Sequence, residues 1–524
     1  MLTRNVLIGL SFLCFFSLIS YSEIYEGEDT PKIYISSIEQ LQQIGLNVNY
    51  PLNGEYELTQ DIDASSTKDW NNGAGFKPIG VSMDKLFDGK FDGKNYVIRN
   101  LHINRPETLA IGLFNFTGKN SEIVNVNLQN VSIKGLGGIG GLIGFNFGLV
   151  NNCKVTGTID SNLNSSNNSA GVCVGGLIGT NVGSVSNCSA ECSVKGSLIC
   201  GGLLGANGST SLGGLGNIEN CYSNSVVSCQ TSGGGLVGYN KYGFIQNSSA
   251  VGKIVDVQQG AGGICGINSS SGTIRCSSAS VWVIGSDTSS IIGGLTGINE
   301  GSIQNCYSLS SVRGGSQVGG FFGSSLGGII TNSYSAGKVK GIGENIGGFG
   351  GYAGETTLPG ITNCYWDKEA SGQTISMGGE GKTTTEMKNS NTFVNWDFNS
   401  IWRITEGQTY PYLYWQNQII TSPVETTEEG EMPLEGSLEG SPEGISEGVV
   451  EGEISGNNNN TQALSSSYTR VVEEEISGNK NTCGCNTKDI KEKGVVKFVV
   501  DFILVGAILI SLLCMGVDSK KDNH

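Results

Sequence analysis

Residues that could support acid–base or metal chemistry are few in this chain. It contains only two histidines, His102 and His524, so a Ser-His-Asp or Cys-His nucleophile would have to use His102. Neither histidine lies in an H-E-x-x-H pattern, which is the signature of many zinc peptidases. We therefore expect His102 to be an ordinary strand or surface residue. We predict no catalytic residue, no cofactor and no metal ligand.

Clustered carboxylates could instead serve a polysaccharide hydrolase or lyase, which is the alternative enzymatic hypothesis. The candidates are Asp61, Asp63, Asp84, Asp88 and Asp92. Asp88 and Asp92 each precede a glycine, and Asp-Gly pairs favour tight turns. We expect these two aspartates to shape turns rather than to bind a metal or a substrate.

The chain has fifteen cysteines, of which Cys14 and Cys514 lie in apolar segments at the two ends. Several of the others recur at the spacing of a repeat, as at Cys153, Cys188 and Cys221. We expect buried thiols that act as small apolar fillers. Disulfides are the open alternative, because a secreted chain meets an oxidising environment.

A glycine motif dominates the middle of the chain. The pentapeptide GGLIG occurs at 140–144 and 175–179, and six later copies read GGLLG, GGLVG, GGICG, GGLTG, GGFFG and GGFGG. Successive copies are 26 to 35 residues apart, which is the range of a solenoid coil. The second and third glycines, which we predict to be structural turn residues, are Gly141, Gly144, Gly176, Gly179, Gly202, Gly205, Gly235, Gly238, Gly263, Gly266, Gly294, Gly297, Gly320, Gly323, Gly348 and Gly351.

A weaker copy at 111–115 ends in Asn115 instead of the third glycine. Since asparagine tolerates left-handed backbone, we predict that the third glycine lies in a turn at positive φ. Of the two residues between the glycines, the first is always large and apolar, as at Leu142, whereas the second varies, as at Thr296. Because adjacent strand residues point to opposite faces, we expect the first to face a core and the second to face outward or a looser layer.

A second column follows each glycine motif. An aliphatic residue is followed two places later by asparagine and then by cysteine or serine, as in Val150, Asn152 and Cys153. Stacked coils would align these asparagines in a ladder that satisfies its own amides.

One such coil cannot bury its apolar face alone, but a stack of coils can. The sequence therefore predicts an all-β fold, a right-handed parallel β-helix or solenoid with nine coils of about 30 residues. We place an N-terminal cap and first coils at 31–108, the repeat solenoid at 109–368 and a C-terminal closing segment at 369–415.

The two ends carry apolar segments. Residues 1–22 have the pattern of a secretory signal peptide, and an N-terminal anchor is the alternative. Residues 494–517 are long and apolar enough for a transmembrane helix, and a lipid-anchor signal is the alternative. An acidic Gly/Ser/Glu-rich linker at 424–493 precedes this helix, and 518–524 would be a short cytoplasmic tail.

Charge and sequons indicate the kind of partner. The formal net charge is −16 and no basic patch is present, so we predict no nucleic-acid partner. N-x-S/T sequons could carry glycans in a eukaryotic host. The glycosylation candidates are Asn115, Asn130, Asn164, Asn207, Asn247 and Asn268.

The repeat resembles the GLUG motif of bacterial surface proteins, adhesin-like proteins and the stalks of immunoglobulin-A-cleaving zinc peptidases. Phe87–Ile103 is similar to the segment that leads into such repeats, and Asn363–Leu413 is similar to the segment that closes them. The resemblance covers about residues 31–415 and implies a surface β-solenoid. It implies no activity, because the repeat accompanies several functions and the peptidase pattern is absent here.

These observations predict a single-pass type I membrane protein at the cell surface. We expect an adhesin-like or surface-coat role, with extracellular glycans or host or self surface proteins as partners besides the membrane. The alternatives are a polysaccharide-acting β-helix enzyme and a purely structural coat protein.

Overall fold

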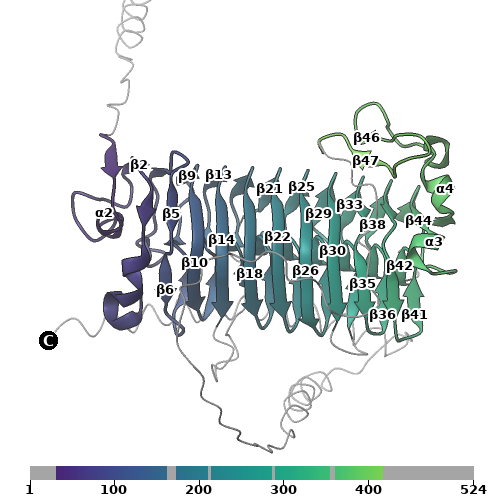
Figure 1. The fold of residues 1–524 in the computed structure, drawn as a ribbon, viewed down its shortest axis with the longest axis horizontal. Helices are drawn as coiled ribbons and strands as arrows, with labels where there is room; N and C mark the ends of the chain where they lie inside the picture. Colours follow the sequence, from purple (N-terminus) through teal and green to yellow (C-terminus); the bar gives the residue numbers. More distant parts are fainter. Residues whose placement is uncertain (1–30, 162–172, 210–213, 286–289, 355–359, 417–524) are drawn as a thin grey trace, which may run out of the picture. The chain divides into compact units, whose positions relative to one another are not determined.

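A computed structural model describes residues 31–161, 173–209, 214–285, 290–354 and 360–416 (Figure 1). The chain divides into two units, and every described residue belongs to the first. The predicted signal peptide (1–22), linker (424–493), transmembrane helix (494–517) and tail (518–524) lie outside the described residues. Among the residues that are described, no helix is long and apolar enough to cross a membrane.

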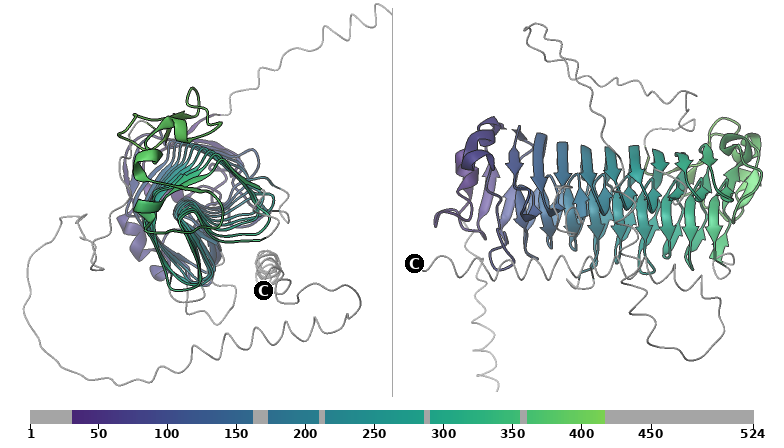
Figure 2. Two further views of the ribbon diagram at one scale, coloured as in Figure 1. Left: turned by 90° about the vertical axis from the view of Figure 1, so that its right-hand side faces the viewer. Right: turned by 90° about the horizontal axis from the view of Figure 1, so that it is seen from below.

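The described chain winds as a parallel β-solenoid, as the sequence predicts. Nine coils of about 29 residues each contribute strands to four parallel sheets, which we name A to D. Within a coil the chain passes from sheet C to D, then to A and B. Figure 2 shows the stacked coils end-on and from below.

The bounds of the strands follow, sheet by sheet. Sheet A contains β1 (Ile33–Ile35), β2 (Glu55–Leu58), β4 (Lys90–Asp92), β9 (Glu122–Val124), β13 (Leu149–Asn151), β17 (Ser184–Ser186), β21 (Asn217–Glu219), β25 (Phe244–Gln246), β29 (Thr273–Arg275), β33 (Ser302–Gln304), β38 (Ile329–Thr331) and β43 (Ile361–Thr362). Sheet B contains β3 (Ile62–Asp63), β5 (Val97–Arg99), β6 (His102–Asn104), β10 (Asn127–Gly135), β14 (Lys154–Ser161), β18 (Ser189–Gly196), β22 (Tyr222–Cys229), β26 (Ser249–Val257), β30 (Ser278–Gly285), β34 (Tyr307–Ser308), β35 (Ser311–Gly314), β39 (Tyr334–Ser335), β40 (Val339–Gly341), β44 (Tyr365–Asp367) and β45 (Glu380–Lys382).

The two remaining parallel sheets have one strand per coil. Sheet C contains β7 (Leu109–Ile111), β11 (Gly137–Ile139), β15 (Cys173–Gly175), β19 (Ile199–Gly201), β23 (Ser232–Gly234), β27 (Gly260–Gly262), β31 (Ile291–Gly293), β36 (Gln317–Gly319) and β41 (Asn345–Gly347). Sheet D contains β8 (Phe114–Phe116), β12 (Ile143–Asn146), β16 (Ile178–Asn181), β20 (Leu204–Asn207), β24 (Val237–Asn240), β28 (Cys265–Asn268), β32 (Thr296–Asn299), β37 (Phe322–Ser325) and β42 (Gly350–Ala353).

Short elements lie before and after the coils. The helix α2 (Ile38–Gln42) and a 3₁₀ segment (Ser65–Gly73) belong to the N-terminal part. The closing segment contains α3 (Lys368–Ser371), α4 (Thr384–Met387), a 3₁₀ turn (Ser390–Thr392) and the antiparallel pair β46 (Trp402–Arg403) and β47 (Tyr412–Leu413). This segment has its own core, in which Met387, Phe393, Trp396 and Trp402 pack with the outward tyrosines of β34, β39 and β44.

The first glycine ends the sheet C strand in most copies, and the second lies at the corner between sheets C and D, where it presses against the opposite sheet B. A Cβ atom on Gly263 would lie 2.6 Å from Cβ of Ala279 and would overlap the Gly294 carbonyl oxygen. In most coils the sheet B residue that faces the corner is alanine or serine. Glycine is required at the corner because backbone meets backbone and small side chains there.

The third glycine is not at positive φ, so that prediction is wrong. Gly144 and Gly179 lie inside strands β12 and β16, and none of the third glycines has a left-handed backbone. Instead, a Cβ on Gly179 would lie 2.6 Å from the Ile139 nitrogen in the preceding coil. Sheets C and D pack too closely at this point for a side chain, which is a steric reason rather than a conformational one.

The residue between the glycines that we expected to face outward is buried as well. Ile143, Ile178 and Thr296 are all 0% exposed, like Leu142 beside them. The alternation rule fails because the chain turns between the two residues, from sheet C into sheet D, and both side chains enter the core.

The asparagine ladder lies in a different column from the one predicted. In the predicted column Asn152, Asn187 and Asn220 are exposed, and they have φ values of 53°, 54° and 53°. Amide contacts in this column are scattered, as from Asn152 Nδ2 to Asn125 Oδ1 (2.7 Å). Asparagine serves here because it tolerates the left-handed turn between sheets A and B.

A continuous ladder instead runs along the last residues of the sheet D strands. Each amide nitrogen except that of the last member donates to the amide oxygen of the next coil at 2.8 to 3.0 Å. Each of these side chains is 0% exposed, and most also donate to a carbonyl in the following turn. The ladder consists of Asn146, Asn181, Asn207, Asn240, Asn268 and Asn299.

We predict that Gly263→Ala lowers the free energy of unfolding by about 3 kcal/mol, because the corner cannot admit a methyl group without moving backbone. Gly260→Ala, in the same coil, is the control. Its Cβ would have no neighbour closer than 3.3 Å, and the aligned residues in adjacent coils are Ser232 and Ile291. Urea unfolding followed by circular dichroism measures both. Equal midpoints for the two variants would contradict the corner argument.

We further predict that Asn240→Ala costs about 3 kcal/mol of stability, because it leaves the Asn207 amide hydrogen and the Asn268 amide oxygen buried without partners. Asn224→Ala, at an exposed position on β22, should shift the urea midpoint little. If the two substitutions have the same effect, the ladder does not stabilise the stack.

Candidate binding face

The carboxylates of the enzymatic hypothesis are already used as acceptors in the first coils. Asp61 pairs with Arg99 at 2.7 Å. Asp63 accepts a hydrogen bond from Asn100, and this bond lowers the pKa of the Asp63 carboxyl. These contacts join neighbouring coils, so the two carboxylates hold the stack together.

Asp88 and Asp92 have the same role. Asp88 accepts from the backbone nitrogen (3.0 Å) and side-chain amide (2.8 Å) of Asn120. Burial opposes ionisation of Asp92, but hydrogen bonds from Asn125 and from the Lys94 nitrogen outweigh it and lower the pKa of Asp92. The bond to the Lys94 nitrogen closes a turn, which agrees with the turn interpretation of this residue.

The remaining candidates for chemistry are scattered. Asp84 is exposed beside the bridge between Ser82 and Lys85. His102 lies in strand β6, where its backbone nitrogen donates to the Thr67 hydroxyl at 3.0 Å. Within the ranges that the structure describes, no group of three or more histidine, cysteine, aspartate or glutamate residues is arranged to hold a metal ion.

The predicted glycosylation sites differ in accessibility. Asn207 and Asn268 are members of the buried ladder, and Asn115 is 5% exposed. A glycan cannot be attached to Asn207 or Asn268 in the folded solenoid, because the amide nitrogens are buried and hydrogen-bonded. Asn130 is exposed and Asn247 is partly exposed, whereas Asn164 lies outside the described residues.

Sheet B carries the surface that best fits a binding role. We define the open face as the outward side chains of β22, β26 and β30. Six of these twelve side chains are apolar or aromatic and are at least partly exposed, with Tyr222 at 36% and Val226 at 47%. We call this group the apolar patch, and its members are Tyr222, Val226, Val251, Val255, Trp282 and Ile284.

The neighbouring strands of the same sheet have a different outer surface. The outward positions of β14 and β18 hold only polar or charged residues. Their charges are partly paired, as Lys154 is with Glu191 at 2.7 Å and Asp160 with Lys134 at 3.8 Å. The apolar patch is therefore a local feature of three coils rather than a property of the whole sheet.

The closing segment bounds the open face on its C-terminal side. Trp415 Nε1 donates to the Cys276 carbonyl at 2.8 Å, and Gln416 Nε2 donates to the Ser278 hydroxyl at 2.9 Å. Beyond that point the outward tyrosines Tyr307 and Tyr334 are covered. The aligned Tyr222, in the same column of sheet B, remains exposed.

The sequence predicts surface partners but indicates no residues that would contact them. The apolar residues are visible in the sequence, since Val251 and Val255 flank Lys253, and Trp282 and Ile284 lie in an unbroken apolar run at 281–284. Successive side chains of a strand point inward and outward in turn. Only the register of the coils decides which of these residues face solvent.

Comparison with known proteins gives partial matches, and no family model matches the chain. A stretch of 145 residues is 38% identical to halomucin of Haloquadratum walsbyi, and it covers 26% of this chain and 2% of that protein. Over 429 residues the chain is 32% identical to a protein of Evansella cellulosilytica named as a Gly-rich membrane protein, covering 79% of this chain and 48% of that one. The chain thus spans about half, or far less, of the length of these relatives.

Solved structures that align with the chain include a candidate immunoglobulin A1 protease from Bacteroides ovatus. It is 20% identical and has a TM-score of 0.38, with 74% of this chain and 94% of that chain covered. A second structure, named IgA1 Protease, is 15% identical with a TM-score of 0.32, covering 76% of this chain and 26% of that chain. These scores are too low to support an argument about function.

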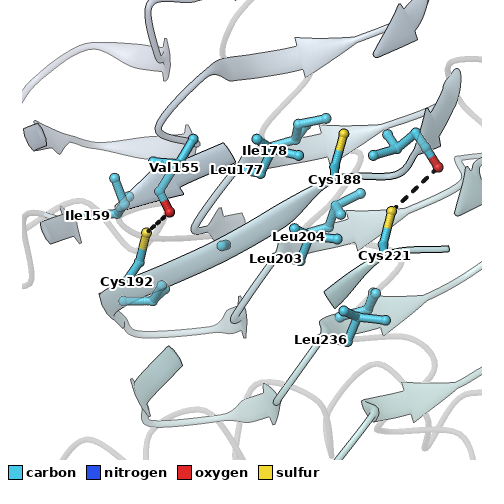
Figure 3. Packing of buried hydrophobic residues seen from close by; sticks show 14 of the residues in the cluster. Val155, Ile159, Leu177, Ile178, Cys188, Cys192, Leu203, Leu204, Cys221 and Leu236 are labelled. Carbon is cyan, nitrogen blue, oxygen red and sulfur yellow. Dashed lines mark hydrogen bonds between the residues drawn. The ribbon is translucent and has the colours of Figure 1, made fainter. Parts of the chain in front are cut away.

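The cysteines of the described ranges are free thiols, which confirms the filler interpretation over disulfides there. Ten are buried and Cys276 is partly exposed. Figure 3 shows Cys188, Cys192 and Cys221 among the aliphatic core residues, with Cys192 Sγ donating to the Val155 carbonyl at 3.5 Å. Burial raises the pKa of the Cys192 and Cys265 thiols to about 12.

We predict that the buried thiols resist modification in the folded protein. A pKa of about 12 leaves roughly one thiol in ten thousand ionised at pH 8, and the thiolate is the reactive form. Treatment with a thiol reagent at pH 8, followed by peptide mapping, should label Cys276 but spare Cys192 and Cys265. The same protein in urea is the control and should react throughout. Rapid labelling of Cys265 in the folded chain would contradict the prediction.

Proposed function

We propose that this chain is a cell-surface β-solenoid protein with an adhesin-like role, which contacts glycans or proteins through the open face. The observation that carries the proposal is the apolar patch. It is a group of partly or fully exposed aliphatic and aromatic side chains on three adjacent strands, whereas the neighbouring strands β14 and β18 present polar residues. Exposed apolar side chains that gather on adjacent strands favour a contact site for a partner, although Lys253 lies between Val226 and Trp282 in this group.

The surface location rests on sequence features and on relatives. Residues 1–22 would direct secretion, 424–493 would act as a spacer and 494–517 would anchor the chain as a type I membrane protein. The names halomucin and Gly-rich membrane protein support a surface or membrane location. The GLUG resemblance supports the same assignment, and we take the winding to be right-handed, as parallel crossover connections are in nearly all proteins.

We propose a binding protein rather than an enzyme. Asp61, Asp63, Asp88 and Asp92 are occupied by contacts between coils, so they are poorly placed to act as a general acid and base. Aromatic and aliphatic side chains on a flat sheet suit contact with a partner better than proton transfer. The purely structural coat remains the competing hypothesis, and it gives no reason for an exposed apolar patch.

Surface labelling of intact cells that produce the full chain tests the proposal. An impermeant amine reagent or an antibody against the solenoid should reach the protein without permeabilisation. The same cells should adhere to a surface coated with glycans or proteins better than cells that lack this chain. Val226→Asp should reduce this adhesion several-fold, because a charge in the patch disfavours an apolar contact. Thr158→Asp, on the polar part of sheet B, is the matched control. Labelling only after permeabilisation would refute a surface location.

A further inference from the structure

We infer that the open face binds an oligosaccharide chain, with Trp282 and Tyr222 as its stacking platforms. This inference rests on the proposed function and names the ligand class and the residues that recognise it. It is carried by the register of three adjacent coils, by unpaired polar groups beside the aromatic rings and by the size of the apolar patch.

The register places residues from distant parts of the sequence side by side. Val226, Lys253 and Trp282 align in one row across β22, β26 and β30. Tyr222, Ser249 and Ser278 align in another row, four positions earlier along the strands. At about 4.8 Å between strands and about 3.3 Å per residue, Tyr222 and Trp282 stand roughly 16 Å apart on a diagonal. Two rings at such a separation can contact separate sugars of one extended chain.

Polar groups on the open face are available for a ligand. Among the described residues, the side chains of Asn224, Ser249, Lys253 and Ser280 make no hydrogen bond or ion pair with one another or with other side chains. Trp282 is partly exposed, and its indole N–H likewise has no partner in the described chain. On β14, by contrast, Lys154 is paired with Glu191. Free donors and acceptors around an aromatic ring match a sugar, which has C–H groups on its faces and hydroxyls at its rim.

The size of the patch favours a sugar chain over a protein partner. Three strands and seven residues along each strand give an area of about 300 Å². A stable protein interface takes about 800 Å² from each partner. The closing segment at Trp415 and Gln416 limits extension of the patch on one side, and the polar surface of β18 limits it on the other. A second copy of this chain or a globular protein would therefore contact much surface that is not apolar, whereas an oligosaccharide of several sugars fits within the patch.

The test uses the full chain, purified in detergent, on an array of neutral and acidic oligosaccharides four to eight sugars long. We expect binding to at least one glycan. Titration with that glycan should change the tryptophan fluorescence. Trp282→Ala and Tyr222→Ala should each weaken binding at least tenfold, and Trp282→Tyr should restore part of it, because a tyrosine ring can also stack. Thr158→Ala, an exposed position on the same side of sheet B, is the matched control and should leave affinity within twofold.

Circular dichroism distinguishes a lost ligand contact from a lost fold, since these side chains lie on the outside of the coils and their removal should leave the spectrum unchanged. The inference is overturned if no glycan binds, or if folded Trp282→Ala binds as well as the parent chain. It is also overturned if the patch binds only protein. In that last case surface labelling and adhesion can still succeed, so the failure of the glycan inference is separable from failure of the proposed function.

Discussion

Close approach of backbones at the glycine corner is the constraint on which the rest of the solenoid depends. Sheets C and D meet without side chains between them at the third glycine, and the corner that joins them touches sheet B at the second glycine. The corner between sheets C and D can therefore reach sheet B of the same coil, and the coil can still stack on the next one. Any larger residue at these places would separate layers that also hold the inter-coil hydrogen bonds. The motif recurs because the backbones approach similarly closely at these glycines in most coils.

The buried asparagine amides of sheet D are satisfied both along the stack and within each coil. The asparagines that end the sheet D strands donate to one another in series, and the carboxylates of the first coils accept from the coil that follows. Burial of an amide is costly unless both of its donors and its acceptor are used. The ladder meets this requirement at Asn181, whose amide donates to Asn207 and to the Gly183 carbonyl and accepts from Asn146. Stability is thus shared between neighbouring coils, as expected for a repeat protein.

Outward-facing positions do not have to pack closely or pair buried polar groups. Their residues can therefore vary from coil to coil. On sheet B the same strand geometry presents paired charges on β14 and β18, an apolar patch on β22 to β30, and tyrosines covered by the closing segment on β34 to β44. The interior changes little along the rod while the exterior changes completely. A solenoid can therefore keep one architecture while its outer surface differs from coil to coil.

The sequence by itself determined the period of the repeat, the number of coils, the parallel stacking and the buried column at Leu142 and its equivalents, because these follow from apolar residues recurring at one spacing. It also showed only two histidines, from which we expect no histidine-based active site. Only the tertiary structure decided that Gly144 is required for close packing, that Asn146 rather than Asn152 begins the continuous ladder, and that Tyr222 and Trp282 share one face. The physical reason is that a repeat specifies contacts between equivalent residues of successive coils. It does not specify which non-equivalent residues meet across a coil, since that depends on how each corner turns.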